Sequence, residues 1–228
     1  MTRAPRYAVY FAPEPTHPLW EAGCRWFGRD PSRPEFKCAP HEASDKPRRY
    51  GFHATLKPPV CLRPSVSGLQ FIDAVYALAA RTPRFAMPAL TVATLRGFVA
   101  LQPRVALDAA HPLRRLADAC VHDLHELGVP PSQQDIDRRL AEGALTEVQS
   151  GFLRRWGYPH VFEHWHFHMT LSNPLAEDEA LLERVRGDAQ AHFASALAQP
   201  LACESLCVFT EPGPGDCFVL SHRIPLAP

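Results

Sequence analysis

The chain has 228 residues, of which 46% are hydrophobic, and this is enough to bury a large core in one domain or two joined lobes. Its 24 basic and 24 acidic residues leave no net charge, which argues against the basic surface of a protein that follows long nucleic acids. The seven cysteines fit no zinc spacing, and we see no signal peptide and no apolar run that could span a bilayer. We therefore expect a monomer in the reducing cytoplasm, with no membrane partner.

The first quarter of the chain predicts two strands separated by a helix and a loop. Residues 6–12 alternate apolar side chains, as a strand does, and residues 16–28 predict a short helix that ends at a glycine. Residues 30–49 are rich in proline and charge and predict a loop. A second strand is expected over residues 50–57, ended by a pair of prolines.

The remaining chain predicts more helix than strand. Ser67 and Gln70 have the spacing of a capping box at the start of a helix that reaches Ala80. A hairpin follows over residues 84–101, with its turn at Gly97. Further helices are expected over residues 108–127, 132–140, 145–156 and 177–197. Further strands are expected over residues 160–172, 201–210 and 217–224.

Two of the predicted strands contain the same pattern, Phe-His-x-Thr-Leu, at residues 52–56 and 167–171. Because successive side chains of a strand point to opposite faces, the histidine and threonine of each copy share one face. By the same alternation, Lys57 lies on the face of the first strand that carries His53 and Thr55. The equivalent face of the second strand carries His166, His168, Thr170 and Ser172. Polar groups on the inner side of a strand favour a wet cleft, with one histidine from each side.

Two imidazoles across one cleft can act as general base and general acid near neutral pH. The hydroxyls of Thr55 and Thr170 can donate to phosphate oxygens, and Lys57 can neutralise their charge. These groups predict cleavage or formation of a phosphodiester without a metal or another cofactor, on a small phosphorylated substrate. We expect His53 and His168 to be catalytic, and His166, Ser172 and Tyr10 to line the cleft.

The order of elements repeats along the chain. Each motif strand is followed by a helix and then by a hairpin, which begins at Arg84 in the first half and at Leu201 in the second. This indicates an internal duplication. We expect an α+β fold of one bilobal domain, with antiparallel sheets lining a central cleft and helices outside. Lobe 1 would cover residues 1–107, a helical linker 108–156, and lobe 2 residues 157–228.

The paired His-x-Thr-Leu motifs resemble those of the 2H phosphoesterase superfamily. The stretches 50–59 and 156–159, together with 167–171, resemble more narrowly a branch encoded beside phosphonate-utilisation genes. The resemblance covers nearly the whole chain. It implies a duplicated α+β fold around one cleft, catalytic roles for His53 and His168, and phosphate binding by Thr55 and Thr170. It favours hydrolysis of a small cyclic phosphodiester of a sugar or nucleoside, in phosphonate metabolism.

Other functions are compatible with the same residues. An RNA end-processing or ligase-like enzyme of the same superfamily is one, and a nucleotide- or RNA-binding module without turnover is another. Alternation along residues 160–172 would also place His164, His166 and His168 on one face, which allows a metal-dependent hydrolase. No cysteine lies on either motif face, so a cysteine nucleophile ranks below these. The sequence leaves open the substrate, the direction of reaction and which histidine is the acid.

Overall fold

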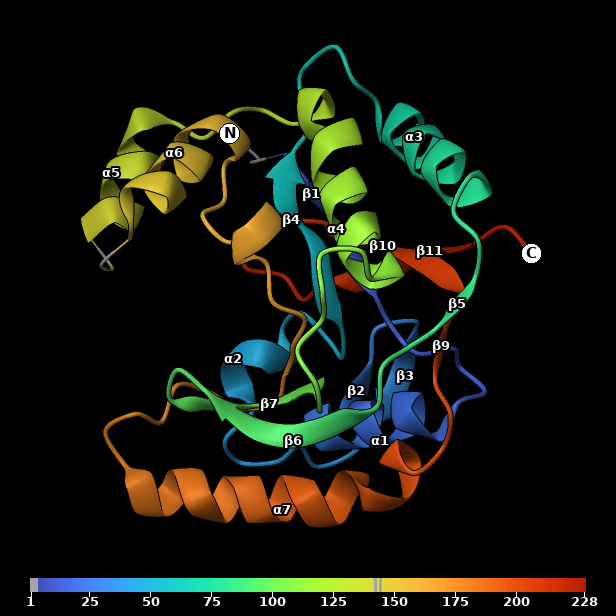
Figure 1. The fold of residues 1–228 in the computed structure, drawn as a ribbon, viewed down its shortest axis with the longest axis vertical. Coiled ribbons are helices and arrows are strands. Elements are labelled where there is room, and N and C mark those ends of the chain that lie inside the picture. The colour runs from blue at the N-terminus through green and yellow to red at the C-terminus, as the bar shows by residue number, and fades with distance from the viewer. Residues whose placement is uncertain (1–3, 142, 144) are drawn as a thin grey trace.

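The computed structural model describes residues 4–141, 143 and 145–228, and two antiparallel sheets form its framework (Figure 1). The first sheet has the order β11-β10-β1-β4 and consists of β1 (Arg6–Phe11), β4 (Ala54–Cys61), β10 (Ser205–Glu211) and β11 (Val219–Pro225). The second has the order β6-β7-β8 and consists of β6 (Leu90–Leu95), β7 (Phe98–Pro103) and β8 (Met169–Thr170). Two short ladders pair β2 (Arg29–Asp30) with β3 (Arg33–Lys37), and β5 (Phe85–Ala86) with β9 (Ala202–Cys203).

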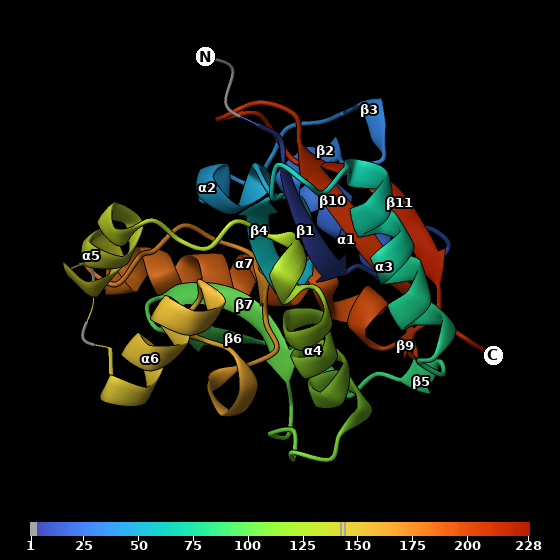
Figure 2. The same cartoon turned by 90° about the horizontal axis from the view of Figure 1, so that it is seen from above.

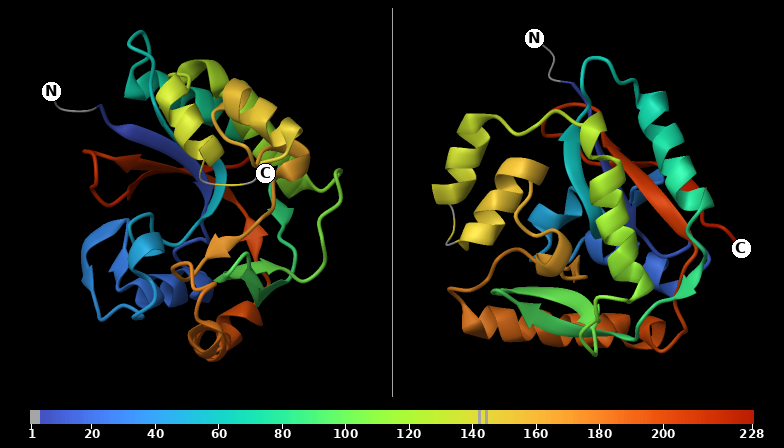
Figure 3. Two further views of the ribbon diagram at one scale, coloured as in Figure 1. Left: turned by 90° about the vertical axis from the view of Figure 1, so that its left-hand side faces the viewer. Right: turned by 45° about the horizontal axis from the view of Figure 1, so that its top comes forward.

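Helices cover both sheets (Figures 1 and 2). The first sheet is covered by α3 (Gly68–Ala80) and α4 (Pro112–Asp123). The second is covered by α7 (Glu179–Leu197), against which α1 (Pro18–Phe27) packs. The shorter helices are α2 (Asp45–Arg48), η1 (His125–Leu127), α5 (Gln133–Ala141), α6 (Glu147–Trp156) and η2 (Phe162–His164). Of these, α5 and α6 pack together at one side of the molecule (Figures 2 and 3).

Local sequence signals explain where several helices begin and end. The Ser67–Gln70 capping box predicted for α3 is present, and Thr146 with Gln149 forms a second one at the start of α6. A glycine in the left-handed conformation, Gly157, ends α6. The helix predicted from residue 108 begins instead at Pro112, after the cap His111.

The two halves of the sequence exchange their hairpins. The hairpin β10–β11 from the second half adds to β1 and β4 of the first half. The hairpin β6–β7 from the first half pairs with β8 of the second. Each sheet therefore contains strands from both halves of the chain. The predicted lobes, 1–107 and 157–228, each contribute strands to both sheets.

The two motif strands differ in length from the prediction. β4 does not stop at the prolines and runs through Pro58 and Pro59 to Cys61. It is an edge strand, where proline can be accommodated because one side of the strand needs no partner. In the second half only Met169–Thr170 is strand, and residues 162–164 form a 3-10 turn, so the strand predicted over 160–172 is mostly irregular chain.

The expected class of fold is confirmed: an α+β chain with antiparallel sheets and helices packed against them. Among the residues that the structure describes, no helix is both long enough and apolar enough to cross a membrane.

Candidate active site

The fold brings the two His-x-Thr motifs together. β4 contacts β8, and the indole Nε1 of Trp165, just before the second motif, donates to the carbonyl oxygen of Thr55 at 2.9 Å. A cavity of about 250 Å³ is lined by Thr55 from the first motif and by His168 from the second. The charge of His168 also lowers the pKa of His53, which means that the two imidazoles are electrostatically coupled. His53 itself does not line the cavity, but its Nε2 lies 3.4 Å from the hydroxyl oxygen of Thr55, which does.

The orientation of His53 is fixed by its own backbone. Gly51 turns the chain with a φ of 81°, and its carbonyl oxygen accepts from His53 Nδ1 at 2.9 Å. Because a carbonyl oxygen can only accept, Nδ1 carries the proton and Nε2 keeps its lone pair. Nε2 lies 3.4 Å from the Thr55 hydroxyl oxygen. The ring of Tyr10 stacks on the imidazole, with centroids 3.8 Å apart.

The orientation of His168 is fixed in the same way. Its Nδ1 donates to the carbonyl oxygen of His166, again two residues earlier and again at 2.9 Å. Its Nε2 is therefore also the nitrogen that can accept a proton. Phe98 from β7 lies beside the imidazole, with centroids 5.9 Å apart. The two motifs thus present chemically equivalent nitrogens.

The pKa values of both histidines are lowered. Burial lowers the pKa of His53 to about 4, while its bond to Gly51 opposes this change and the charge of His168 adds to it. The pKa of His168 is lowered mainly by burial, and further by the charges of His166 and Arg96. Both imidazoles are neutral at pH 7 when the site is empty of anions, and an anion beside them would raise both values.

Phe52, the residue before His53, anchors the first motif in the core. Its ring stacks on Phe193 of α7 with centroids 5.8 Å apart and lies close to Phe27 of α1. A Cβ on Gly23 of α1 would meet the Phe52 ring at 2.1 Å, so only glycine leaves room for it. The packing holds the start of the motif rigidly against both helices.

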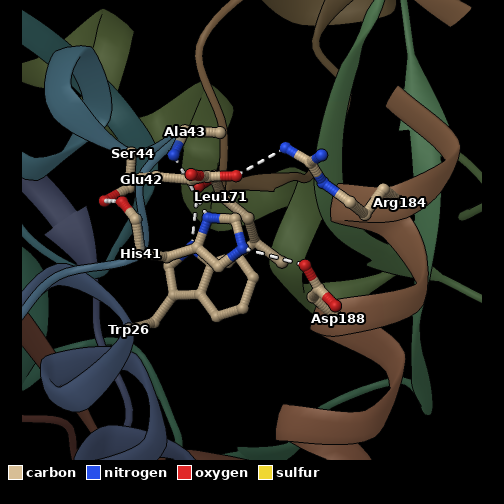
Figure 4. Close-up of polar contacts among 8 residues, drawn as sticks. All are labelled: Trp26, His41, Glu42, Ala43, Ser44, Leu171, Arg184 and Asp188. Atoms are coloured by element: carbon tan, nitrogen blue, oxygen red, sulfur yellow. Dashed lines mark hydrogen bonds and ion pairs between the residues drawn. The ribbon is translucent and has the colours of Figure 1, made fainter. Parts of the chain in front are cut away.

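The end of the second motif is held by a separate cluster of side chains (Figure 4). Trp26 Nε1 donates to the carbonyl oxygen of Leu171 at 2.8 Å. The indole stacks on His41, with centroids 4.0 Å apart and planes 10° from parallel. The other side of His41 contacts Asp188 of α7, at 3.3 Å between Nε2 and Oδ2. This cluster positions the segment that carries His168.

Of the other predicted site residues, two line the cavity and the rest do not. Thr55 and His166 line the cavity. Thr170 lies on β8 opposite Ala100 of β7 and is partly exposed. Tyr10 is 1% exposed and contacts His53, so it supports the histidine. Ser172 is also buried, and its hydroxyl accepts from Val99 N and holds β7 in place.

Lys57 lies away from the cavity, although strand alternation predicted that it would share a face with His53 and Thr55. Between β1 and β4 the register shifts, so that Tyr10 faces Thr55 but Val9 faces Lys57. This β-bulge inserts one extra residue into β4 and reverses the alternation that the sequence implies. Lys57 is 3% exposed, and burial lowers its pKa to about 8, a change that the neighbouring Cys120 of α4 opposes.

Three polar residues of the cavity were not assigned to the site from the sequence: Arg96, His160 and Tyr158. Arg96 sits at the tip of the β6–β7 hairpin, whose turn the sequence did predict. No local pattern could connect this turn with the second motif, because the two meet only through the pairing of β7 with β8. An arginine at a turn position that normally favours a small residue was the available signal.

The arrangement does not support the metal hypothesis for His164, His166 and His168. The backbone that carries them is not a strand, so they share no face by alternation. Within the described ranges, no three histidine, cysteine, aspartate or glutamate side chains gather as a metal ion would require. Of the three, His168 already uses Nδ1 for the carbonyl oxygen of His166.

Comparison with known proteins finds relatives along nearly the whole chain. The profile of the family described as "Protein of unknown function (DUF1045)" matches residues 55–219. A "Ribose 1,5-bisphosphate phosphokinase PhnN" of Janthinobacterium sp. (strain Marseille) is 35% identical over 238 residues, covering 97% of this chain and 51% of that protein. A protein of the same name from Laribacter hongkongensis (strain HLHK9) is 37% identical over 227 residues, covering 96% and 51%. The chain thus spans about half the length of these curated relatives.

Solved structures give a more distant likeness. E. coli LigT complexed with NADP+ has a TM-score of 0.47 and 14% identity, over 100% of both chains. A structure described as a phosphoesterase has a TM-score of 0.44 and 14% identity, over 98% of this chain and 99% of that one. With identities and TM-scores this low, the activity of the chain has to follow from its own residues.

Proposed function

We propose that this chain, which belongs to the family described as "Protein of unknown function (DUF1045)", is a phosphoesterase that opens a small cyclic phosphodiester by two-histidine general acid–base catalysis. The observation that carries the proposal is the matched pair His53 and His168. Each is fixed through Nδ1 to a carbonyl oxygen and leaves Nε2 for proton transfer. Two such nitrogens in one site are the parts that a phosphodiester needs for attack and departure.

We assign the two roles from the surroundings of the two histidines. The more strongly buried His53, with a pKa of about 4, is the base, and His168 is the acid once a phosphate anion has raised its pKa. His53 Nε2 takes a proton from water, and the water oxygen attacks phosphorus. The ring P–O bond breaks, and the departing oxygen receives the proton of His168 Nε2. The product is a phosphate monoester with a free hydroxyl.

Threonine hydroxyls support the charge that develops on the phosphate. Thr55 lines the cavity beside His53 and can donate to a non-bridging oxygen. Thr170 has the equivalent position in the second motif, and we assign it the same role. No step of this reaction passes through a metal ion.

The cavity favours a compact substrate over a long one. Its volume of about 250 Å³ lies just below the roughly 300–1,000 Å³ of sites for drug-sized ligands. The chain has no net charge to attract a polyphosphate backbone. A sugar cyclic phosphate therefore fits better than RNA, and the resemblance to the phosphonate-associated branch favours a role in phosphonate metabolism. Tight RNA binding at physiological salt without turnover of small cyclic phosphates would favour RNA processing or a binding module.

The name of the curated relatives raises a second candidate, phosphoryl transfer from a nucleotide. A P-loop kinase holds its nucleotide with the pattern Gly-x-x-x-x-Gly-Lys-Ser/Thr, and this sequence contains no glycine followed by lysine. Since the chain spans about half of each relative, we assign the phosphokinase to the half that it does not match.

Turnover of a panel of small cyclic phosphates tests the proposal. We expect hydrolysis of at least one pentose cyclic phosphate, unaffected by EDTA. His53→Ala and His168→Ala should each lose at least about a hundredfold in kcat. The exposed His122 on α4 provides the control, and His122→Ala should keep the full rate. Nearly unchanged turnover in both motif variants, or complete loss of activity on chelation, would contradict the mechanism.

A further inference from the structure

The tip of the β6–β7 hairpin carries an arginine where the backbone favours another residue. Leu95 pairs with Phe98, so Arg96 and Gly97 form a two-residue loop. Their φ angles are 46° and 81°, and two positive values in succession define the turn that prefers Asn-Gly. An arginine in the left-handed region is unfavourable because its Cβ crowds the following carbonyl. The turn alone therefore does not account for Arg96.

The side chain of Arg96 makes its contacts at the cavity. The guanidinium lines the cavity, and its Nη1 lies 3.2 Å from Nε2 of His160. Since a guanidinium can only donate, His160 Nε2 accepts. Among the described residues, no carboxylate forms an ion pair with Arg96. Within this part of the chain, the cation is held at the cavity without a counter-ion.

The rest of this wall is also basic. Of the residues that the structure describes, no aspartate or glutamate lines the cavity, whereas four histidines do: His160, His164, His166 and His168. After burial, the charge of Arg96 is the largest cause that lowers the pKa of His160 and of His166. The histidines lower one another's pKa as well. Such mutual repulsion is relieved when an anion binds among the groups.

We propose that Arg96, with His160 and His166, forms a second anion subsite that binds a phosphate monoester at the far end of the substrate. The subsite rests on the proposed phosphoesterase function and defines its substrate class: a small cyclic phosphodiester that carries an additional phosphate. Arg96 lies two residues before β7, which pairs with β8 next to His168, whereas His53 precedes β4 of the other sheet. The subsite therefore lies on the His168 side of the cavity.

Arg96→Asn tests this subsite without endangering the fold. Asparagine is favoured in the first position of this turn, so the variant should unfold at the same temperature as the parent or a higher one. It removes the fork of donors that binds a phosphate. Arg96→Lys keeps the charge but not the fork and should be intermediate. Arg104→Asn, at the opposite end of the same hairpin and exposed, is the matched control.

The substrates are ribose 2,3-cyclic phosphate and the same compound with a 5-phosphate. The parent protein should prefer the phosphorylated compound by at least about tenfold in kcat/KM, the contribution of one charge-assisted contact. Arg96→Asn should lose that preference, which is measured as the ratio of kcat/KM on the two compounds because the charge of Arg96 also acts on His168. Turnover of both compounds without preference, and with no effect of Arg96→Asn, would overturn the subsite while leaving the phosphoesterase in place.

Binding without turnover separates the two proposals. Calorimetry with ribose 5-phosphate should show binding that Arg96→Asn weakens at least about tenfold and Arg104→Asn does not. If this result came without hydrolysis of any cyclic phosphate, the subsite would stand and the phosphoesterase would fall. Equal affinity in the parent protein and in Arg96→Asn would count against the subsite.

Discussion

The two motifs have the same local geometry and different surroundings. In both, Nδ1 of the histidine donates to a carbonyl two residues earlier, which leaves Nε2 for chemistry. His53 is covered by the ring of Tyr10, whereas His168 shares its wall with Arg96. The repeated sequence thus fixes the tautomer, and the non-repeated neighbours set the pKa. A duplicated motif can in this way supply two unlike partners for one reaction.

The largest expected effect comes from removing each histidine and changing the leaving group. On an alkyl phosphodiester, His53→Ala and His168→Ala should both lose at least about a hundredfold. A p-nitrophenyl phosphodiester releases a stable anion that needs no proton. With this substrate we expect His168→Ala to recover to within about tenfold of the parent rate, and His53→Ala to stay inactive. Recovery of His53→Ala instead would reverse the acid and base.

The second effect concerns pH. His53, with its pKa lowered to about 4, is neutral and available as a base above that value, so kcat/KM should fall as the pH drops through about 4. On the alkaline side kcat/KM should fall as His168 loses its proton, below the usual 6.5, because its pKa is lowered too. We therefore expect a bell-shaped dependence of kcat/KM on pH, with both limbs below pH 6.5.

Tyr10→Leu should shift the acid limb of this kcat/KM profile. Removing the stacked ring admits water to His53 and raises its pKa toward 6.5. A rise of about one unit would lower kcat/KM up to about tenfold at pH values below the new limb. Phe98→Leu, beside His168, is the matched change and should shift only the alkaline limb. Identical profiles for both variants would mean that the surroundings do not set the pKa values.

The parts of this molecule that the sequence predicts are those with local causes. A capping box at Ser67 begins α3, and the motif residues His53 and His168 are recognised because they repeat. The α+β class follows from the same local periodicities. What the sequence could not predict depends on pairing between distant segments. The approach of Arg96 to the second motif requires β7 to pair with β8.

The position of Lys57 is the other example. Alternation places it beside Thr55, and only the register of β4 against β1 reveals the bulge that turns it away. A bulge is a property of two strands together, so one strand's sequence does not contain it.

The smallest expected effect on activity comes from changing a residue four positions after one of the two motif histidines. Lys57 and Ser172 occupy these positions, and both are buried. The hydroxyl of Ser172 makes two hydrogen bonds, with Val99 N and with the Asn173 carbonyl oxygen. The structure gives the Lys57 ammonium no hydrogen bond within the described part of the chain, and burial of the side chain lowers its pKa, which means that the charged form is less favourable in the folded protein.

Lys57→Met should therefore stabilise the fold and leave activity unchanged. The pKa of Lys57 is lowered from 10.5 to about 8 in the folded protein, so below about pH 8 the folded chain bears the full cost of a buried ammonium. This cost shrinks as the pH rises from about 8 to 10.5 and then vanishes. Urea unfolding should show the variant more stable by up to about 3 kcal/mol at pH 7, with the difference gone above pH 10.5. A loss of turnover in Lys57→Met at unchanged stability would instead return Lys57 to the phosphate site.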